Sequence, residues 1–166
     1  ETALYEYGNL DSVEIRGVEF EMKASVSDNL QASFGFSIPD GKENEEQLVS
    51  IDSEEAILGL VWTSGDNRFN LSGYASFTAG SHDNLAPSCG RGGCNPLLTL
   101  SGNTVFDLYG SYQLNENLKV RFAIRNLTDE SYWNWASVQG KSATDPNLSL
   151  FMEPGRNLSA GIKYQF

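Results

Sequence analysis

The sequence contains little histidine, cysteine and positive charge. One histidine and two cysteines occur in 166 residues, which are too few ligands for a protein-held metal site. Neither a nucleophile elbow nor a glycine-rich phosphate loop is present, so nothing points to acid–base or nucleophilic catalysis, and we do not expect an enzyme. Eleven Lys and Arg against 22 Asp and Glu give a net charge of -11. This balance argues against a nucleic acid partner, because phosphate binding needs clustered cations.

Long hydrophobic runs are also missing. No stretch of 18 apolar residues occurs, so the sequence contains no candidate membrane-spanning helix. A transmembrane barrel is still compatible with this composition, because a barrel strand exposes only every second side chain to lipid. The sequence starts at Glu1, without an initiator methionine or a signal peptide, and we therefore expect a mature form or a fragment.

The chain is rich in alternation between polar and apolar residues. In residues 157–166 every second side chain is apolar and the others are polar or small. Side chains change face at each residue of a strand, so this pattern predicts a β-strand. A partial strand is expected at residues 3–7, and a slip in the alternation at Gly17 predicts a β-bulge. The same alternation predicts strands at residues 13–26, 30–38, 56–62, 69–77, 106–114 and 118–124.

Short polar turns alternate with long loops along the chain. In an up-and-down meander the short turns gather at one end and the long loops at the other, an asymmetry typical of outer-membrane barrels. The sequence therefore predicts an all-β, antiparallel up-and-down meander of seven to eight strands, as part of a transmembrane β-barrel. The expected turns are at residues 27–29, 64–67 and 115–117, and the expected loops are at 39–53, 80–101 and 126–156.

The two strand faces differ in a way that favours a barrel. Charged side chains such as Arg121 and Lys163 fall opposite the apolar face, where a barrel has its lumen. Aromatic residues such as Trp62 and Phe77 fall near strand ends on the apolar face, where aromatic belts meet the bilayer interfaces. Two alternatives stay open at this point: a self-contained eight-stranded barrel with a structural or adhesive role, and a secreted soluble β-sandwich.

The two cysteines lie close together in the longest loop. Four residues separate Cys89 from Cys94, and two of these are adjacent glycines, so the thiols are able to meet. We expect a disulfide that closes a small exposed loop, which implies an oxidising compartment. The alternative is a pair of free thiols.

Two motifs near the end of the chain resemble those of a known family. The segment R-N-L-T-D-E-S-Y-W-N-W at 125–135 and the segment E-P-G-R-N-L-S-A-G-I-K-Y-Q-F at 153–166 resemble the end of a TonB-dependent outer-membrane receptor. The earlier R-G-V-E-F-E at 16–21 matches a strand of the same family. The resemblance implies the outer membrane of a Gram-negative bacterium and a barrel of about 22 strands, so residues 1–166 are expected to be its C-terminal segment. The N-terminal plug and TonB box would lie upstream.

The resemblance also implies partners and a ligand. The chain ends on Phe166, preceded on the same face by Tyr164 and Ile162, as in the signal that the barrel-assembly machinery reads. Other implied partners are outer-membrane lipid and the TonB complex, which would be reached through the missing N-terminal region.

The variant Y-W-N-W at 132–135 resembles the branch that takes up haem or captures haemoglobin, with a siderophore as the alternative cargo. Tyr132, Trp133 and Trp135 are candidate contacts to a flat macrocycle, or else they pack the loop. His82 is a candidate haem-iron ligand, or else a solvated side chain. Haem would be a transported ligand, and no resident cofactor or metal is expected.

Overall fold

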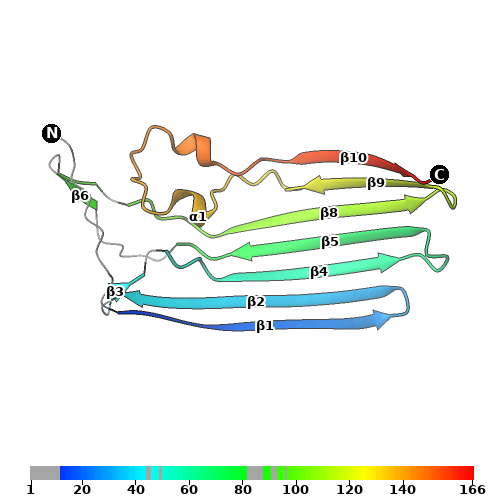
Figure 1. Ribbon diagram of the computed structural model, residues 1–166, viewed down its shortest axis with the longest axis horizontal. Coiled ribbons are helices and arrows are strands. Elements are labelled where there is room, and N and C mark those ends of the chain that lie inside the picture. Colours follow the sequence, from blue (N-terminus) through cyan, green and yellow to red (C-terminus); the bar gives the residue numbers. More distant parts are fainter. Residues whose placement is uncertain (1–11, 44–45, 49, 82–87, 91–92, 96) are drawn as a thin grey trace.

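The computed structural model describes residues 12–43, 46–48, 50–81, 88–90, 93–95 and 97–166. Seven long strands form one antiparallel sheet in the order β1-β2-β4-β5-β8-β9-β10, and each pairs with the next long strand along the chain (Figure 1). The predicted meander is therefore confirmed. The long strands are β1 (Val13–Ser27), β2 (Leu30–Glu43), β4 (Glu55–Thr63), β5 (Phe69–Thr78), β8 (Asn103–Gln113), β9 (Leu118–Arg125) and β10 (Asn157–Tyr164).

Shorter elements lie in the segments predicted as loops. They are β3 (Glu46–Gln47), β6 (Ser88–Gly90), β7 (Gly93–Asn95), the short helix α1 (Trp135–Val138) and the 3₁₀ turn η1 (Leu148–Phe151). Strand β3 pairs with the end of β2, and β6 pairs with β7. The expected partial strand at residues 3–7 lies outside the described residues. No helix among the described residues is long and apolar enough to cross a membrane.

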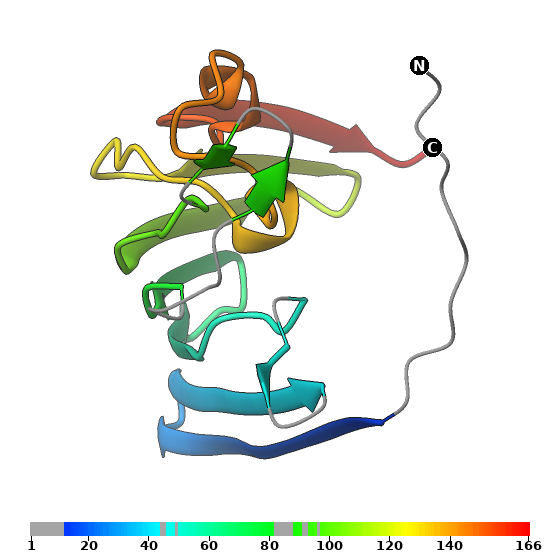
Figure 2. The same cartoon turned by 90° about the vertical axis from the view of Figure 1, so that its left-hand side faces the viewer.

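The predicted tight turns are confirmed, and all three lie at one end of the sheet (Figure 1). In the β4–β5 turn, the amide of Asn67 donates to the Ser64 carbonyl at 2.8 Å, and Asn67 has a φ of 57°, a conformation that asparagine tolerates. The Ser64 hydroxyl accepts from the amide of Phe69 at 2.9 Å. Figure 2 views the opposite end, where α1, η1 and the β6–β7 hairpin gather.

The prediction of a bulge at Gly17 is wrong. Gly17 stands directly opposite Pro39, and the β1–β2 register shifts only between Ser25 and Ser27. A Cβ atom at Gly17 would lie 3.2 Å from the Ile38 carbonyl oxygen, so close backbone approach explains the glycine. The predicted loop from residue 39 is also wrong at its start, because β2 continues through Pro39 to Glu43.

The cross-strand register gathers most apolar side chains on one face of the sheet and most polar and charged side chains on the other. On the apolar face, Leu60 pairs with Ala32 and Gly73. On the polar face, Gly59 pairs with Ser33 and Tyr74. Aromatic rings gather toward both ends of the apolar face, with Phe20, Phe34 and Phe36 in contact near the loops and Trp62, Phe69 and Tyr112 in contact near the turns.

The height of the apolar face fits a bilayer. Phe69 and Phe77 are eight positions apart on β5, which is about 26 Å along a strand. A strand tilted by about 40° spans roughly 20 Å of membrane over that length, close to the apolar band of about 25 Å in outer-membrane barrels. The two aromatic groups are therefore separated by about the distance between the two membrane–water interfaces, where aromatic belts occur.

The sheet has no hydrophobic core of its own. The buried hydrophobic residues among those described are Ile51, Trp135 and Val138, and all three lie outside the long strands. On the apolar face Leu60 is 55% exposed. A soluble sandwich would cover this face with a second sheet, and none of the described residues does so. Strands β1 and β10 end the order of the sheet without pairing with each other, so the described chain forms an open wall and not a closed eight-stranded barrel.

Candidate functional site

Residues 126–156, which we call the β9–β10 loop, fold over one end of the sheet and start at a buried asparagine. Asn126 is 3% exposed and has a φ of 51°. Its side-chain nitrogen Nδ2 donates to the carbonyls of Glu130 at 2.8 Å and Pro154 at 3.3 Å. Its side-chain oxygen Oδ1 accepts from the Glu130 backbone amide at 2.7 Å. The backbone amide of Asn126 donates to Asp107 Oδ1 at 2.9 Å. Asn126 therefore ties β8 and both ends of the loop together.

The two family-like motifs meet at the base of this loop. Asp129 Oδ1 accepts from the backbone amide of Arg156 at 2.7 Å. A Cβ atom at Gly155 would lie 2.7 Å from the same carboxylate oxygen, so only glycine leaves room for this contact. The N-L-T-D and P-G-R motifs thus close the loop on itself, which is a structural role.

The upper part of the loop is a small packed unit that contains both candidate tryptophans. Trp135 starts α1 and is 6% exposed, while Asn134 caps the helix by accepting from the Ala136 amide at 2.9 Å. The indole nitrogen of Trp133 donates to the Leu148 carbonyl at 2.9 Å, which ties the segment before α1 to η1. The loop therefore has a defined shape, with Trp133 half-buried and Trp135 inside it.

Tyr132 is the candidate residue that reaches the polar face. It borders a broad hollow on that face, together with Asn134 above and Tyr74, Asp107 and Lys23 from the strands. Burial raises the pKa of the Tyr132 hydroxyl, and the nearby charges of Glu153 and Asp107 raise it further. Tyr132 therefore stays neutral at physiological pH and presents an aromatic ring and a hydroxyl donor beside the wall.

The wall below Tyr132 carries a tyrosine pair that the sequence analysis did not single out. The hydroxyl of Tyr109 donates to Asp107 Oδ2 at 3.0 Å, and the rings of Tyr74 and Tyr109 meet edge to face with centroids 5.9 Å apart. A Cβ atom at Gly59 would lie 2.9 Å from the Tyr74 ring, so that ring covers the glycine. The alternation placed these residues on the polar face, but only the register brings them together.

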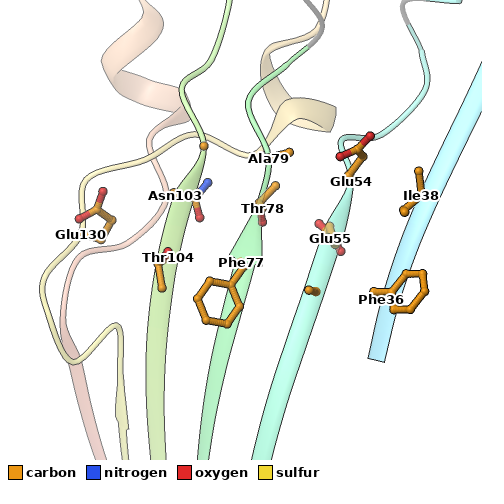
Figure 3. Close-up of a pocket in the computed structure, with 12 residues that line it drawn as sticks. Phe36, Ile38, Glu54, Glu55, Phe77, Thr78, Ala79, Asn103, Thr104 and Glu130 are labelled. Atoms are coloured by element: carbon orange, nitrogen blue, oxygen red, sulfur yellow. The ribbon is translucent and has the colours of Figure 1, made fainter. Parts of the chain in front are cut away.

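A second hollow lies on the apolar side of the sheet at the loop end (Figure 3). Phe36 and Phe77 line its lower part, and the carboxylates of Glu54 and Glu130 stand at its upper rim. Rings below and carboxylates above match the change from hydrocarbon to headgroups at a bilayer interface. This hollow is therefore a membrane boundary and not a candidate ligand site.

The remaining predicted site residues are widely separated. His82 lies outside the described residues. Ile162, Tyr164 and Phe166 lie at the free edge of the sheet, where the Tyr164 and Phe166 rings meet edge to face at 5.1 Å. No group of three or more potential metal ligands is found among the described residues.

The cysteines stand opposite each other in the β6–β7 hairpin, where Cys89 is in register with Cys94. The disulfide stays a prediction that this register supports. We expect both thiols to resist alkylation until a reductant is added, because a disulfide sulfur does not react as a thiolate nucleophile. Mass spectrometry would then count two alkyl groups only after reduction. Rapid labelling of the untreated protein would exclude the bond.

A comparison with protein families and curated proteins gives clear relatives. A family model described as TonB dependent receptor-like, beta-barrel matches residues 1–127. Hemoglobin-binding protein A of Haemophilus influenzae is 22% identical over 180 residues, an alignment that covers 95% of this chain and 18% of that protein. This chain therefore spans about a fifth of the length of that relative.

Solved structures share the fold. The copper transporter OprC resembles this chain with a TM-score of 0.74 at 21% identity, over 93% of this chain and 23% of that one. A mutant ferric enterobactin receptor from Pseudomonas aeruginosa resembles it with a TM-score of 0.66 at 18% identity, over 92% of this chain and 22% of that one. These identities establish the fold and leave the substrate open.

The family model covers most of the chain, and the structure agrees with it in each feature that a barrel wall requires. The sheet is an antiparallel meander with short turns at one end, an uncovered apolar face with aromatic ends and a polar face with charges. This chain therefore belongs to the TonB-dependent receptor-like β-barrel family, whose members are transporters of the Gram-negative outer membrane and not enzymes.

Proposed function

We propose that this chain is the C-terminal segment of the barrel of an outer-membrane receptor that imports an iron compound, with haem as the favoured cargo. The observation that carries the choice of haem is the alignment over 95% of the chain with a protein named for binding hemoglobin. The rest of the polypeptide would supply a plug domain and the segment that contacts TonB. The proposed partners are the TonB complex, outer-membrane lipid and the barrel-assembly machinery, which would read Phe166, Tyr164 and Ile162.

Tyr132 is the proposed main contact to the ligand within the described residues. Tyr132 borders the hollow on the polar face; its hydroxyl, whose pKa burial raises further above the ordinary value, is available as a hydrogen-bond donor. A flat macrocycle is able to stack on such a ring, and aromatic pairs contribute about 0.5–1.5 kcal/mol beyond area burial. Trp133 is a second proposed contact and His82 a proposed iron ligand. Trp135 is proposed to act mainly by supporting the loop, because it is 6% exposed.

A haem titration of the purified full-length receptor tests this function. We expect a stoichiometric Soret shift with micromolar or tighter affinity. Tyr132→Ala should weaken binding by up to roughly tenfold, which corresponds to the loss of one aromatic contact. Tyr112→Ala is the matched control, because Tyr112 lies on the apolar face away from the lumen, and it should leave the affinity unchanged. His82→Ala should remove the part of the shift that comes from iron ligation.

One outcome would contradict the proposal, and another would contradict a narrower expectation about the isolated segment. A folded receptor that binds a ferric siderophore or copper, and shows no Soret shift with haem, would exclude haem as the cargo. Residues 1–166 alone are not expected to bind, because an isolated part of the wall cannot enclose the same lumen as the whole barrel. Stoichiometric binding of haem by the isolated segment would therefore show that the site is complete within this wall.

A further inference from the structure

Strand β4 carries apolar residues on both of its faces. From Ala56 to Trp62 the sequence reads A-I-L-G-L-V-W, so Ile57 and Val61 fall on the polar face, where a wall beside water would carry polar groups. A near-continuous apolar run is typical of a strand that is covered on both faces. Lipid covers one face of β4. On the other face Ile57 is 46% exposed, so the described residues leave it uncovered.

Ile57 is part of an apolar surface in the hollow that Tyr132 borders. The side chains of Ile57, Val105 and Tyr74 all line this hollow, and we call these three the apolar floor. In the register of the sheet, Ser76 stands between Ile57 and Val105. Two strand spacings therefore separate Ile57 from Val105, which is about 10 Å. The floor is thus wide enough to meet one side of a flat ring system.

Two glycines keep the apolar floor low. Gly35 stands opposite Ile57, and a Cβ atom at Gly35 would lie 3.5 Å from Ile57 Cγ2. The ring of Tyr74 covers Gly59, where a Cβ atom would lie 2.9 Å from that ring. Because these two positions carry no side chain, the side chains of Ile57 and Tyr74 extend over them. A low surface of this kind suits a flat ligand better than a globular one.

Carboxylates surround the apolar floor. Glu19, Glu55 and Asp107 line the same hollow. Lys23 is a cation at the hollow, and it pairs with Glu21 at 2.7 Å. Among the described residues no salt bridge joins Glu19, Glu55 or Asp107 to a cation. A ligand with anionic groups on all sides would be repelled here, whereas a ligand with its anionic groups on one edge is able to turn that edge away.

We propose that the apolar floor binds the uncharged face of a planar macrocycle, an inference that rests on the proposed haem function. Small-molecule sites are typically apolar surfaces with polar groups at fixed places around them, and the hollow has this arrangement. Ile57 and Val105 contact the face of the ring system from the wall, and Tyr132 contacts it from the loop. The carboxylates around the floor select against polyanionic ferric chelates.

Titrations of the full-length receptor with haem and with metal-free protoporphyrin test this inference. The two compounds share one planar ring system, and only haem offers an iron ion to a protein ligand. Ile57→Thr and Val105→Thr should each weaken the binding of both compounds by roughly fivefold, because each variant replaces apolar contact area with a hydroxyl. The readouts are the Soret band of haem and the fluorescence of protoporphyrin. Threonine is β-branched and favours strands, so both variants keep the fold.

Two variants serve as controls. Val61→Thr introduces threonine on the same face of β4, four positions nearer the turns and outside the hollow, and should leave both affinities unchanged. Ile57→Leu keeps the apolar contact, and its affinities should stay within about twofold of the wild type. The change at Ile57 therefore acts through its contact with the ring system and not through the strand.

The outcomes separate this inference from the proposed function. A wild-type receptor that binds neither compound would overturn both. Wild-type binding that Ile57→Thr and Val105→Thr leave unchanged would overturn the inference alone, and a loss of stability in the same variants would identify a polypeptide segment as the cover of the floor. Weaker binding of haem with unchanged binding of protoporphyrin would show that the effect depends on iron. Tight binding of a polyanionic ferric catecholate that Ile57→Thr weakens would overturn the planar class of ligand.

Discussion

Replacing Leu60 with arginine should lower the stability of the assembled receptor by about 2–4 kcal/mol, the cost of a cation on the lipid face near the bilayer midplane. Leu60 lies midway between the two aromatic groups of the apolar face, and its cross-strand partners Ala32 and Gly73 are too small to shield it. With 55% of its surface exposed, the new side chain would meet hydrocarbon. The measurement is the free energy of unfolding of the full-length receptor in phospholipid.

The control is Gln31→Arg on the adjacent strand. Gln31 is exposed on the polar face, where it pairs with Val61, so its arginine would meet the lumen and should change stability little. The charge introduced by Phe122→Arg should cost less than that of Leu60→Arg, because Phe122 lies in the same row as Trp62 of the turn-side aromatic group, one row nearer the turns than Leu60. The Phe122→Arg variant would also lose the packing of the Phe122 ring on Gly110. Equal stabilities for Leu60→Arg and Gln31→Arg would show that the faces are assigned the wrong way round.

The long strands were predictable because each keeps a two-residue period over most of its length. Where this alternation breaks, the cause lies in contacts between residues that are far apart in the sequence. Val13 and Ile15 look out of phase with the rest of β1, which suggested a bulge at Gly17. The unbroken register instead puts them on the polar face, next to Gly41. A Cβ atom at Gly41 would lie 2.4 Å from Ile51 Cγ1, so an apolar loop residue packs on that face at this end, although Ile15 itself is 63% exposed.

The candidate site was predictable only in part. The motif around Tyr132 located the loop, but the burial of Trp135 depends on the fold of the whole loop. Asp107 could not be identified from alternation, because its role comes from Tyr109 on its own strand and from Asn126 at the end of the next. The contact between Asn126 and Pro154 joins residues 28 positions apart, which no local pattern reports.

Replacing Asn126 with alanine should loosen the β9–β10 loop without unfolding the sheet. The variant leaves the Glu130 amide, the Glu130 carbonyl and the Pro154 carbonyl without their side-chain partner in part-buried contacts, at up to about 1–3 kcal/mol for each group that water does not reach. It also forces alanine into a left-handed conformation, at about 1–2 kcal/mol. We expect the opening free energy of the loop to fall by about 3 kcal/mol, which is roughly a hundredfold increase in exchange of the Glu130 and Arg156 amides with solvent.

Two further variants separate the side-chain effect from the backbone effect. Asn126→Gly removes the same hydrogen bonds but accepts a positive φ without strain, so it should lose about 1 kcal/mol less than alanine. Thr128→Ala changes an exposed neighbour and should leave exchange unaltered. If Asn126→Ala exchanges its loop amides at the wild-type rate, the loop is held by other contacts, and Tyr132 owes its place over the polar face to the packing around Trp133 and Trp135 instead.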